Sequence, residues 1–396
     1  MELGVVGKPN VGKSTFFSAA TLAPAQIANY PFTTIEPNRG VAYVRTKCPH
    51  VDLGVQCNPN NSPCKDGTRL VPVEMIDVAG LVPGAHEGKG LGNKFLDDLR
   101  QASSLIHVID VSGGTTEDGT PTKPGTRDPA LDAKFLEDEI SFWIKGILDK
   151  DWRRLSKQAE LDGAKIERVL HERFTGLGFT EAQIQAAIRK AALGPRPSVW
   201  TEDDMVGLAR HLQKVGKPML LAANKYDLAA EGAVDKLRSS VDGQVVATCA
   251  DYELALRKAA QAGLVDYLPG AADFKILEPS KLSAKQTDAL ERIRQQMKAH
   301  GGTGVQKCIE SSIFETLGLI IVYPVEDENK YTDKQGRVLP DAHLIPKGST
   351  ARDLAYRVHT DLGQNFIRAV DARTKRVIGQ DHVLKDGDVV TIFAKR

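Results

Sequence analysis

The stretch LGVVGKPNVGKST, residues 3–15, decides the fold of this 396-residue chain. Its apolar start, Leu3–Gly7, predicts a buried strand, and the pattern G-x-x-x-x-G-K-[ST] spans Gly7–Ser14. The pattern follows a strand and precedes a helix that we expect to start at Lys13, which is the context of loops that wrap around phosphate groups. The glycines let the backbone approach an anion, and the helix N-terminus presents positive charge to it.

The residues of this loop have individual predicted roles. We expect Lys13 to reach the β- and γ-phosphates of a nucleotide and the hydroxyl of Ser14 to bind Mg²⁺. Backbone amides supply further phosphate contacts, so the predicted nucleotide-binding residues of the loop are Asn10, Val11, Gly12, Lys13, Ser14 and Thr15. The alternative is a glycine-rich turn that binds nothing, and the complete motif in its proper context argues against it.

Composition and charge set broad limits. The 52 Lys and Arg residues nearly balance the 51 Asp and Glu residues, so net charge does not indicate a nucleic-acid partner. No apolar run approaches the roughly 20 residues that span a bilayer, and the start MELGVVG lacks the features of a signal peptide. Five cysteines in so long a chain do not form a disulfide framework. We therefore expect a cytoplasmic protein without a membrane partner.

Further apolar runs alternate with helical stretches. Strands are predicted at residues 40–45, 70–76, 105–111, 219–223 and 243–248. This alternation indicates an α/β fold with a mainly parallel sheet that is covered on both faces. We expect residues 1–128 and 216–250 to form this nucleotide-binding P-loop domain.

Two long helical stretches, residues 129–215 and 251–317, interrupt this order. We expect them to pack together as a helical domain or insertion. The last segment, residues 319–396, begins with the apolar strand LIIVYPV and continues with one helix and several short strand-like pieces. Ser349 or Thr350 is the expected N-cap of that helix, and the pattern favours a small, separate mixed sheet.

Two more motifs follow predicted strands. In Asp77-Val78-Ala79-Gly80, Asp77 is placed to hold the Mg²⁺ shell through water, and the Gly80 N–H to contact the γ-phosphate. In Asn224-Lys225-Tyr226-Asp227, the Asp227 carboxylate can accept hydrogen bonds from N1 and the exocyclic amino group of guanine. Adenine lacks this pair of donors, so Asp227 favours GTP over ATP.

A third motif, Thr248-Cys249-Ala250, follows the next predicted strand. The Ala250 backbone N–H can complete a base pocket there, although a plain strand–loop junction is as good an interpretation of this motif alone. Each motif is weak by itself, but all lie at carboxyl ends of predicted strands, where ligands of open α/β sheets bind. The predicted base-binding residues are therefore Asn224, Lys225, Asp227, Cys249 and Ala250.

Two segments are candidates for nucleotide-dependent switches. Tyr30-Pro31-Phe32-Thr33-Thr34 lies between the first two motifs, and one of its threonines is expected to add a hydroxyl to Mg²⁺. We favour Thr34, with Thr33 as the alternative, so the predicted metal ligands are Ser14, Thr34 and Asp77. The glycine-rich residues 81–92 form the second candidate, which we expect a nucleotide or a partner to order.

Several of these stretches resemble one known family. GKPNVGKST, YPFTTIEPN and DVAGLVPGAHEGKGLGNKFL closely resemble the Obg-like GTPases, specifically the YchF-related branch of archaeal type. The segment from YPVEDENKYTDKQGRVLPDAHLIPKGST onward looks like a TGS domain, a small β-grasp module. The resemblance implies a GTPase domain with a helical insertion, a C-terminal TGS domain, and a role near the ribosome or other structured RNA. Some relatives depart from N-K-x-D and prefer ATP, whereas this chain keeps Asp227.

The source of catalysis is less clear than the binding site. In many small GTPases a glutamine directly after D-x-x-G orients the attacking water, but this chain has Leu81 there. In similar GTPases, an asparagine at the position of Asn10 helps to hold K⁺ as an extra positive charge; the alternative is that Asn10 only shapes the loop. His86 is a weaker candidate for positioning water. The predicted catalytic residues are Lys13, Thr34, Gly80 and Asn10.

Two weaker signals remain. Cys48, His50, Cys57 and Cys64 supply four potential zinc ligands, but their spacing fits no standard ribbon or finger, so free thiols on a surface loop are favoured over a zinc site. Arg373-Thr374-Lys375-Arg376 is the best local basic cluster, and such a turn is usually solvated surface.

The predicted function is that of a GTP-binding and GTP-hydrolysing switch that associates with the ribosome or structured RNA. One alternative is an RNA- or ribosome-binding module whose nucleotide site is regulatory and weakly hydrolytic, as Leu81 suggests. The other alternative is an ATPase, against which Asp227 argues.

Overall fold

The computed structural model describes residues 2–22, 39–78 and 92–395. The described chain divides into two compact units. The first contains residues 2–22, 39–40, 74–78 and 92–308, and the second contains residues 41–73 and 309–395. In the described part of the chain, no helix combines the length and the apolar character needed to cross a bilayer.

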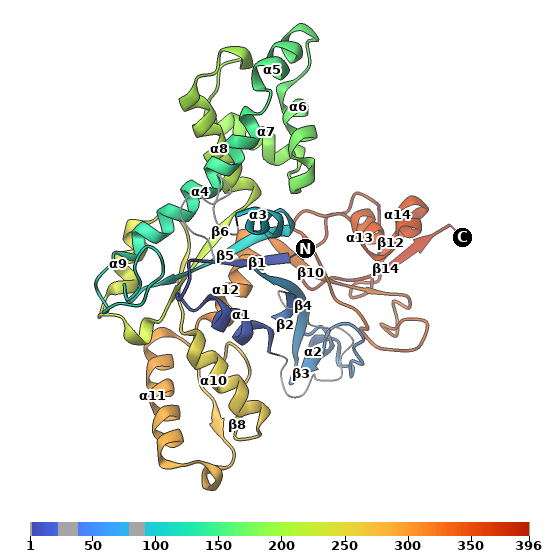
Figure 1. Cartoon of the computed structure of the whole chain (residues 1–396). Coiled ribbons are helices and arrows are strands. Elements are labelled where there is room, and N and C mark those ends of the chain that lie inside the picture. The colour runs from blue at the N-terminus through green and yellow to red at the C-terminus, as the bar shows by residue number, and fades with distance from the viewer. Residues whose placement is uncertain (1, 23–38, 79–91, 396) are drawn as a thin grey trace. The chain divides into compact units, whose positions relative to one another are not determined.

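The largest sheet has the strand order β2-β4-β1-β5-β6-β7, with the short β3 beside β4 (Figure 1). Strand β1 pairs in parallel with β4 and β5, and the pairs β5–β6 and β6–β7 are also parallel. The central β1 is buried after its first residue, as expected of a parallel strand covered on both faces. The predicted α/β fold with a mainly parallel sheet is therefore confirmed. The strands are β1 Glu2–Val6, β2 Arg39–Lys47, β3 Cys64–Lys65, β4 Thr68–Asp77, β5 Ala102–Asp110, β6 Met219–Asn224 and β7 Val245–Ala247.

Helices flank this sheet in the first unit. Helix α1, Lys13–Thr21, directly follows the phosphate loop and buries Phe16 and Phe17. Helix α3, Gly92–Gln101, leads into β5, and α9, Ala233–Ser240, lies between β6 and β7 in the chain.

The helical stretch between β5 and β6 shares one buried core with α3 and with strands of the large sheet. Its helices are α4 Pro129–Asp149, α5 Trp152–Leu161, α6 Ile166–Phe174, α7 Glu181–Ala191 and α8 Glu202–Gly216. Asp128 caps α4 by accepting a hydrogen bond from the Ala130 amide, and Pro129 occupies the first helical turn, where its missing N–H costs nothing. The apolar side of α4, including Ile140 and Ile144, is fully buried in a core shared with α6, α7 and α8.

The second helical stretch has a separate core. Helix α10, Ala250–Gln261, and helix α11, Ala284–His300, pack with the two-stranded sheet of β8, Val265–Asp266, and β9, Lys275–Ile276. In Figure 1 these elements lie at the opposite end of the first unit from α5–α8. The expectation that residues 129–215 and 251–317 pack together is therefore not met, because the first stretch shares its core with the large sheet and the second packs with β8 and β9. Helix α12, Val305–Ser311, completes this stretch.

The C-terminal part of the second unit is a small mixed sheet with the order β11-β10-β14-β12-β13. Strands β10 and β14 are parallel and the other pairs are antiparallel. Thr350 caps α13 in a reciprocal pair with Asp353, which decides between the two predicted caps. The elements are β10 Leu319–Val325, β11 His343–Pro346, α13 Ala351–Val358, α14 Thr360–Gln364, β12 Phe366–Asp371, β13 Arg376–Ile378 and β14 Val389–Ala394.

The second unit also contains the insertion that follows β2. It holds the short helix α2, His50–Leu53, an irregular loop, and the hairpin of β3 and β4. Asp66 and Gly67 form its two-residue turn with φ of 49° and 80°. Both positive values match a type I′ turn, for which Asp-Gly is a preferred sequence.

Candidate nucleotide-binding site

The phosphate loop needs glycine at both ends because other chain segments press against it. Gly7 has φ 154°, and a Cβ atom there would lie 2.6 Å from the carbonyl oxygen of Val108. Gly12 has φ 93°, and a Cβ atom there would lie 2.3 Å from Nδ2 of Asn224. Neither space can hold a side chain. Gly12 is also the N-cap of α1, whose first turn has no acidic residue, so its amides can face an anion.

Three residues with predicted roles at the phosphates meet beside this turn. The Lys13 ammonium forms an ion pair with Oδ1 of Asp77, and Oγ of Ser14 lies 3.4 Å from Oδ2 of the same carboxylate. The motifs at Gly7–Ser14 and Asp77 are thus brought together, as the sequence predicts. Val11 is buried within the loop, and Thr15 lies in the first turn of α1.

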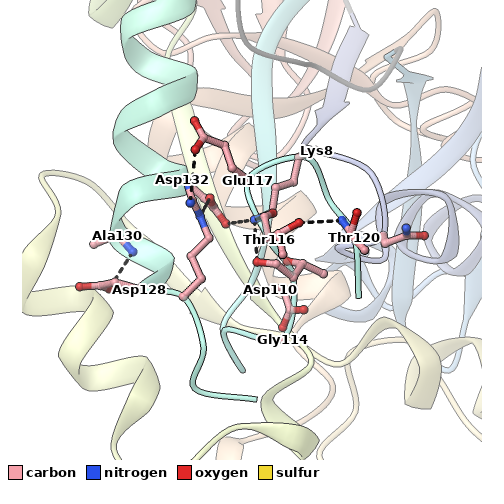
Figure 2. A network of polar contacts seen from close by, with 12 residues as sticks. Lys8, Asp110, Gly114, Thr116, Glu117, Thr120, Asp128, Ala130 and Asp132 are labelled. Carbon is pink, nitrogen blue, oxygen red and sulfur yellow. Dashed lines mark hydrogen bonds and ion pairs between the residues drawn. The ribbon is translucent and has the colours of Figure 1, made fainter. Parts of the chain in front are cut away.

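A second lysine of the loop has a role that the sequence reading missed. The Nζ atom of Lys8 is buried, lies 2.6 Å from Oδ2 of Asp132 in α4, and donates to the carbonyl oxygens of Thr115 and Thr116 (Figure 2). Asp132 also accepts a 2.8 Å hydrogen bond from Nε of Arg127. Lys8 occupies a variable position of the motif, and Asp132 is one of several buried polar residues of α4, so the sequence offered no clear signal of this pair.

Asn10 and Lys225 fix the tip of the loop. The Asn10 side chain donates from Nδ2 to the carbonyl oxygen of Gly119 at 2.9 Å. Lys225 donates to the Asn10 carbonyl oxygen at 2.7 Å and to Oδ2 of the buried Asp110 at 2.9 Å. Lys225 thus links the Asn224–Asp227 motif directly to the phosphate loop.

Asn224 joins the two ends of the predicted site. Its Nδ2 donates to the Val11 carbonyl oxygen at 2.8 Å, and its Oδ1 accepts from the Ala250 N–H at 3.0 Å. The sequence predicts that the Ala250 N–H contacts the base of a nucleotide, whereas in the structure it donates to Asn224. Asn224 is buried, and its contacts position the two loops.

Asp227 carries the predicted specificity for guanine. Its Oδ1 accepts a hydrogen bond from Sγ of Cys249 at 3.2 Å. Burial, reinforced by the Asp227 charge, raises the pKa of Cys249, so the thiol stays protonated and can donate. Asp227 itself is half-buried, which leaves part of the carboxylate available to a ligand.

A buried histidine lies on β5 behind these contacts. Burial, followed by the positive charge of Lys8, lowers the pKa of His107 to about 3. Its Nδ1 atom has no hydrogen-bond partner among the residues that the structure describes. His107 is therefore a neutral side chain at neutral pH.

Several predicted residues cannot be placed. Both switch predictions stay predictions, because the described residues do not include Thr33, Thr34, Gly80, Leu81 and His86.

The four potential zinc ligands and the basic turn Arg373–Arg376 lie in the second unit. Cys48, His50, Cys57 and Cys64 are gathered in one cluster, and the choice between free thiols and a zinc site stays a prediction.

The basic turn Arg373–Arg376 is partly tied down. Arg373 donates to the Gly387 carbonyl oxygen and lies 3.7 Å from Asp52. Lys375 lies over the ring of Tyr331, 4.6 Å from its centroid. These contacts agree with the interpretation of this turn as ordinary surface.

Comparisons with known proteins agree with this arrangement. Residues 2–132 match the family of 50S ribosome-binding GTPases, residues 222–327 match the Obg-like GTPase YGR210-like, G4 motif-containing domain, and residues 330–394 match the TGS domain. A GTP-binding protein of Methanocaldococcus jannaschii is 51% identical over 99% of this chain and 98% of its own. The ribosome-binding ATPase YchF of Haemophilus ducreyi is 28% identical over 98% of both chains.

A solved structure shows the same fold over the whole chain. The GTP-binding protein from Pyrococcus horikoshii superposes with a TM-score of 0.80 at 42% identity and covers all of both chains. With the phosphate loop, Asp77 and Asn224–Asp227 assembled in order along one sheet, the chain belongs to the Obg-like GTPases of the YchF-related branch, with a C-terminal TGS domain.

Proposed function

We propose that this protein binds and hydrolyses GTP in preference to ATP and acts as a switch that associates with the ribosome. The observation that carries the nucleotide part is the position of Asp227. Its carboxylate follows the β6 strand, and β6 also carries Asn224, the residue bonded to the phosphate loop. A carboxylate at this place complements the N1–H and amino donors of guanine and repels the ring nitrogens of adenine.

The phosphate end of the site would act through fixed dipoles and charges. The first-turn amides of α1 and the Lys13 ammonium would hold the β- and γ-phosphates once the Lys13–Asp77 ion pair opens. Ser14 and Asp77 present oxygen donors, the ligand type that Mg²⁺ prefers, and Thr34 is the proposed third contributor. A bound Mg²⁺ would neutralise charge that develops on the phosphate oxygens.

The proposed hydrolysis also needs a group that stabilises the transition state, because no glutamine follows Gly80. Leu81 follows Gly80, and its side chain has no polar atom to orient water. We propose that K⁺ supplies the extra positive charge. The Asn10 Nδ2 bond to Gly119 leaves the amide oxygen of Asn10 as the atom for this ion. Equal rates of GTP hydrolysis in KCl and NaCl would end this part of the proposal.

Nucleotide preference is tested by competition. Unlabelled GTP should displace a fluorescent GDP analogue at much lower concentration than ATP does, and Asp227→Ala should remove most of this difference. The relative from Haemophilus ducreyi is named an ATPase, so stronger displacement by ATP in the unmodified protein would assign that activity here instead.

Association with the ribosome is supported by the name of the same relative and by the TGS domain. Co-sedimentation with ribosomes should be stronger with a non-hydrolysable GTP analogue than with GDP. Leu81 favours a second function, a ribosome-binding module that hardly hydrolyses nucleotide. Single-turnover hydrolysis that stays slow with ribosomes present would favour this second function.

A further inference from the structure

Four metal-ligating side chains of the second unit converge on one point. Cys48, His50, Cys57 and Cys64 each offer one ligand atom, and all four atoms lie within 4.8 Å of one another. Nδ1 of His50 and Sγ of Cys64 are 3.7 Å apart. In a tetrahedral zinc site, Zn–S bonds of about 2.3 Å and Zn–N bonds of about 2.0 Å place neighbouring ligand atoms roughly 3.6–3.8 Å apart. We propose that these four side chains bind one structural zinc ion.

The three sulfur atoms and one nitrogen atom of the cluster are ligands that zinc prefers in structural sites. Three thiolates and one imidazole form a complete tetrahedral shell, and such a closed shell leaves no position for a reacting water. Cys48 and Cys57 are buried, and His50 and Cys64 are half-buried, so the cluster is largely shielded from solvent. Soft sulfur ligands disfavour Mg²⁺ and Ca²⁺, which prefer oxygen.

Backbone structure, rather than a regular motif, gathers the ligands. Cys48 directly follows β2 and donates its N–H to the Gly67 carbonyl oxygen at 2.8 Å, which ties it to the hairpin turn. His50 is the first residue of α2, and Cys64 is the first residue of β3, which pairs with β4 in the hairpin. Cys57 comes from the irregular loop between α2 and β3. The turn at Gly67 therefore holds Cys48 beside the hairpin that carries Cys64.

A buried cation beside the cluster matches the charge of the proposed site. Zn²⁺ with three thiolates and a neutral imidazole carries one net negative charge. The Arg69 guanidinium is fully buried, and its Nη1 lies 3.9 Å from Sγ of Cys48. Its other donors reach Ser62 and the carbonyl oxygens of Leu339 and Pro340, which are neutral groups. No ion pair between Arg69 and a carboxylate is found in the described parts of the chain, so a zinc-bound thiolate at Cys48 would supply negative charge beside the guanidinium.

The ion would hold a segment that has little apolar core of its own. Asn58 and Asn60 of the irregular loop donate backbone N–H groups to the carbonyl oxygens of Val338 and Pro340, and Asn61 donates to that of Ala342. These bonds join the insertion to the C-terminal part of the second unit. A metal at Cys57 would fix the middle of the loop and so keep these donors in place.

Metal analysis of the full-length protein tests the proposal. The protein is expressed with added zinc, purified without chelators, freed of any histidine tag, and measured by inductively coupled plasma mass spectrometry. We expect about one zinc per chain. Cys57→Ser and Cys64→Ser should reduce the content to near zero. The matched control Cys308→Ser changes another buried cysteine, outside the cluster, and should retain the metal.

Two further measurements keep the test valid if a serine variant fails to fold. Reduced, metal-free protein titrated with Co²⁺ should develop the visible bands and thiolate charge-transfer absorption of a tetrahedral cobalt site. His50→Cys should keep zinc because it offers a fourth thiolate, whereas His50→Ala should weaken zinc binding. Zinc near zero in the unmodified protein without a cobalt spectrum, iron in its place, or a disulfide within the cluster would each overturn the proposal.

Discussion

Positive charge is balanced in different ways in the phosphate loop and in the insertion around Cys48–Arg69. Lys8, Lys13 and Lys225 each form an ion pair with a carboxylate. Buried Arg69, by contrast, faces neutral carbonyl groups and the sulfur of Cys48. A lysine–carboxylate pair can exchange its partner for a phosphate, whereas a thiolate cluster requires a cation that stays. We propose that Lys13 exchanges Asp77 for a phosphate, whereas the buried Lys8–Asp132 pair and a metal in the insertion stay in place.

The largest expected effect concerns a pair that should not exchange. In Asp132→Ala, the Lys8 ammonium keeps its place in a site that excludes water, because the Lys8 and Asp132 side chains are only 5% and 8% exposed. Removing one partner of such a pair typically costs about 3–5 kcal/mol of unfolding free energy, which denaturant titration would measure. Asp138→Ala on the same helix breaks the exposed pair with Arg210 and should cost less than about 1 kcal/mol. Equal losses would show that Lys8 does not depend on Asp132.

The next effect concerns the pair that should exchange. Lys13→Ala removes the ammonium that we propose moves from Asp77 to the phosphates, so GTP affinity should fall by about 100-fold, the scale of charge-assisted hydrogen bonds. Isothermal calorimetry with GDP and a GTP analogue would measure this change. Lys236→Ala, an exposed lysine on α9, is the control and should bind normally. Unchanged affinity in Lys13→Ala would refute the exchange.

A smaller effect tests the charge balance of the insertion. Arg69→Met should weaken zinc binding by about 10–100-fold, the usual cost of losing a group that supports metal ligands. Competition with a chromophoric chelator would measure the affinity. Arg69→Lys keeps the positive charge and should retain most of it. If Arg69→Lys lost as much affinity as Arg69→Met, the hydrogen bonds of the guanidinium rather than its charge would be decisive.

The effect that is smallest near neutral pH comes from His107, the buried histidine on β5. The unfolded chain binds a proton at His107 below its ordinary pKa of 6.5, and the folded protein does not until about pH 3. Stability should therefore fall as the pH decreases from 6.5 toward 3, by about 1 kcal/mol per pH unit from this group. The difference in unfolding free energy between the unmodified protein and His107→Leu should change with this slope. Parallel pH profiles would contradict it.

Much of the first region could be predicted because its information is local. Gly7–Ser14, Asp77 and Asn224–Asp227 each follow an apolar strand, and parallel strands bring their carboxyl ends to one edge. The contacts of Lys8 with Asp132 and of Ala250 with Asn224 could not be predicted, because tertiary packing sets these partners. A pattern along the chain does not report such pairs.

The grouping of Cys48, His50, Cys57 and Cys64 could not be predicted for a related reason. Spacing rules describe ligands that lie on short, regular turns, whereas Cys57 lies in a loop held by backbone hydrogen bonds to Val338 and Pro340. The separation of the two helical stretches was missed as well, since an apolar stripe such as that of α4 shows that a helix packs but not against which partner.

The two hydrogen bonds of Asn224 connect two loops of the candidate nucleotide-binding site. One holds the loop that faces the phosphates, at Val11, and the other holds the loop that faces the base, at Ala250. These two hydrogen bonds therefore fix the distance between the two loops before any ligand binds. If the protein binds a nucleotide here as proposed, pyrophosphate or a free nucleoside would contact only one of the two loops and should bind more weakly than the whole nucleotide.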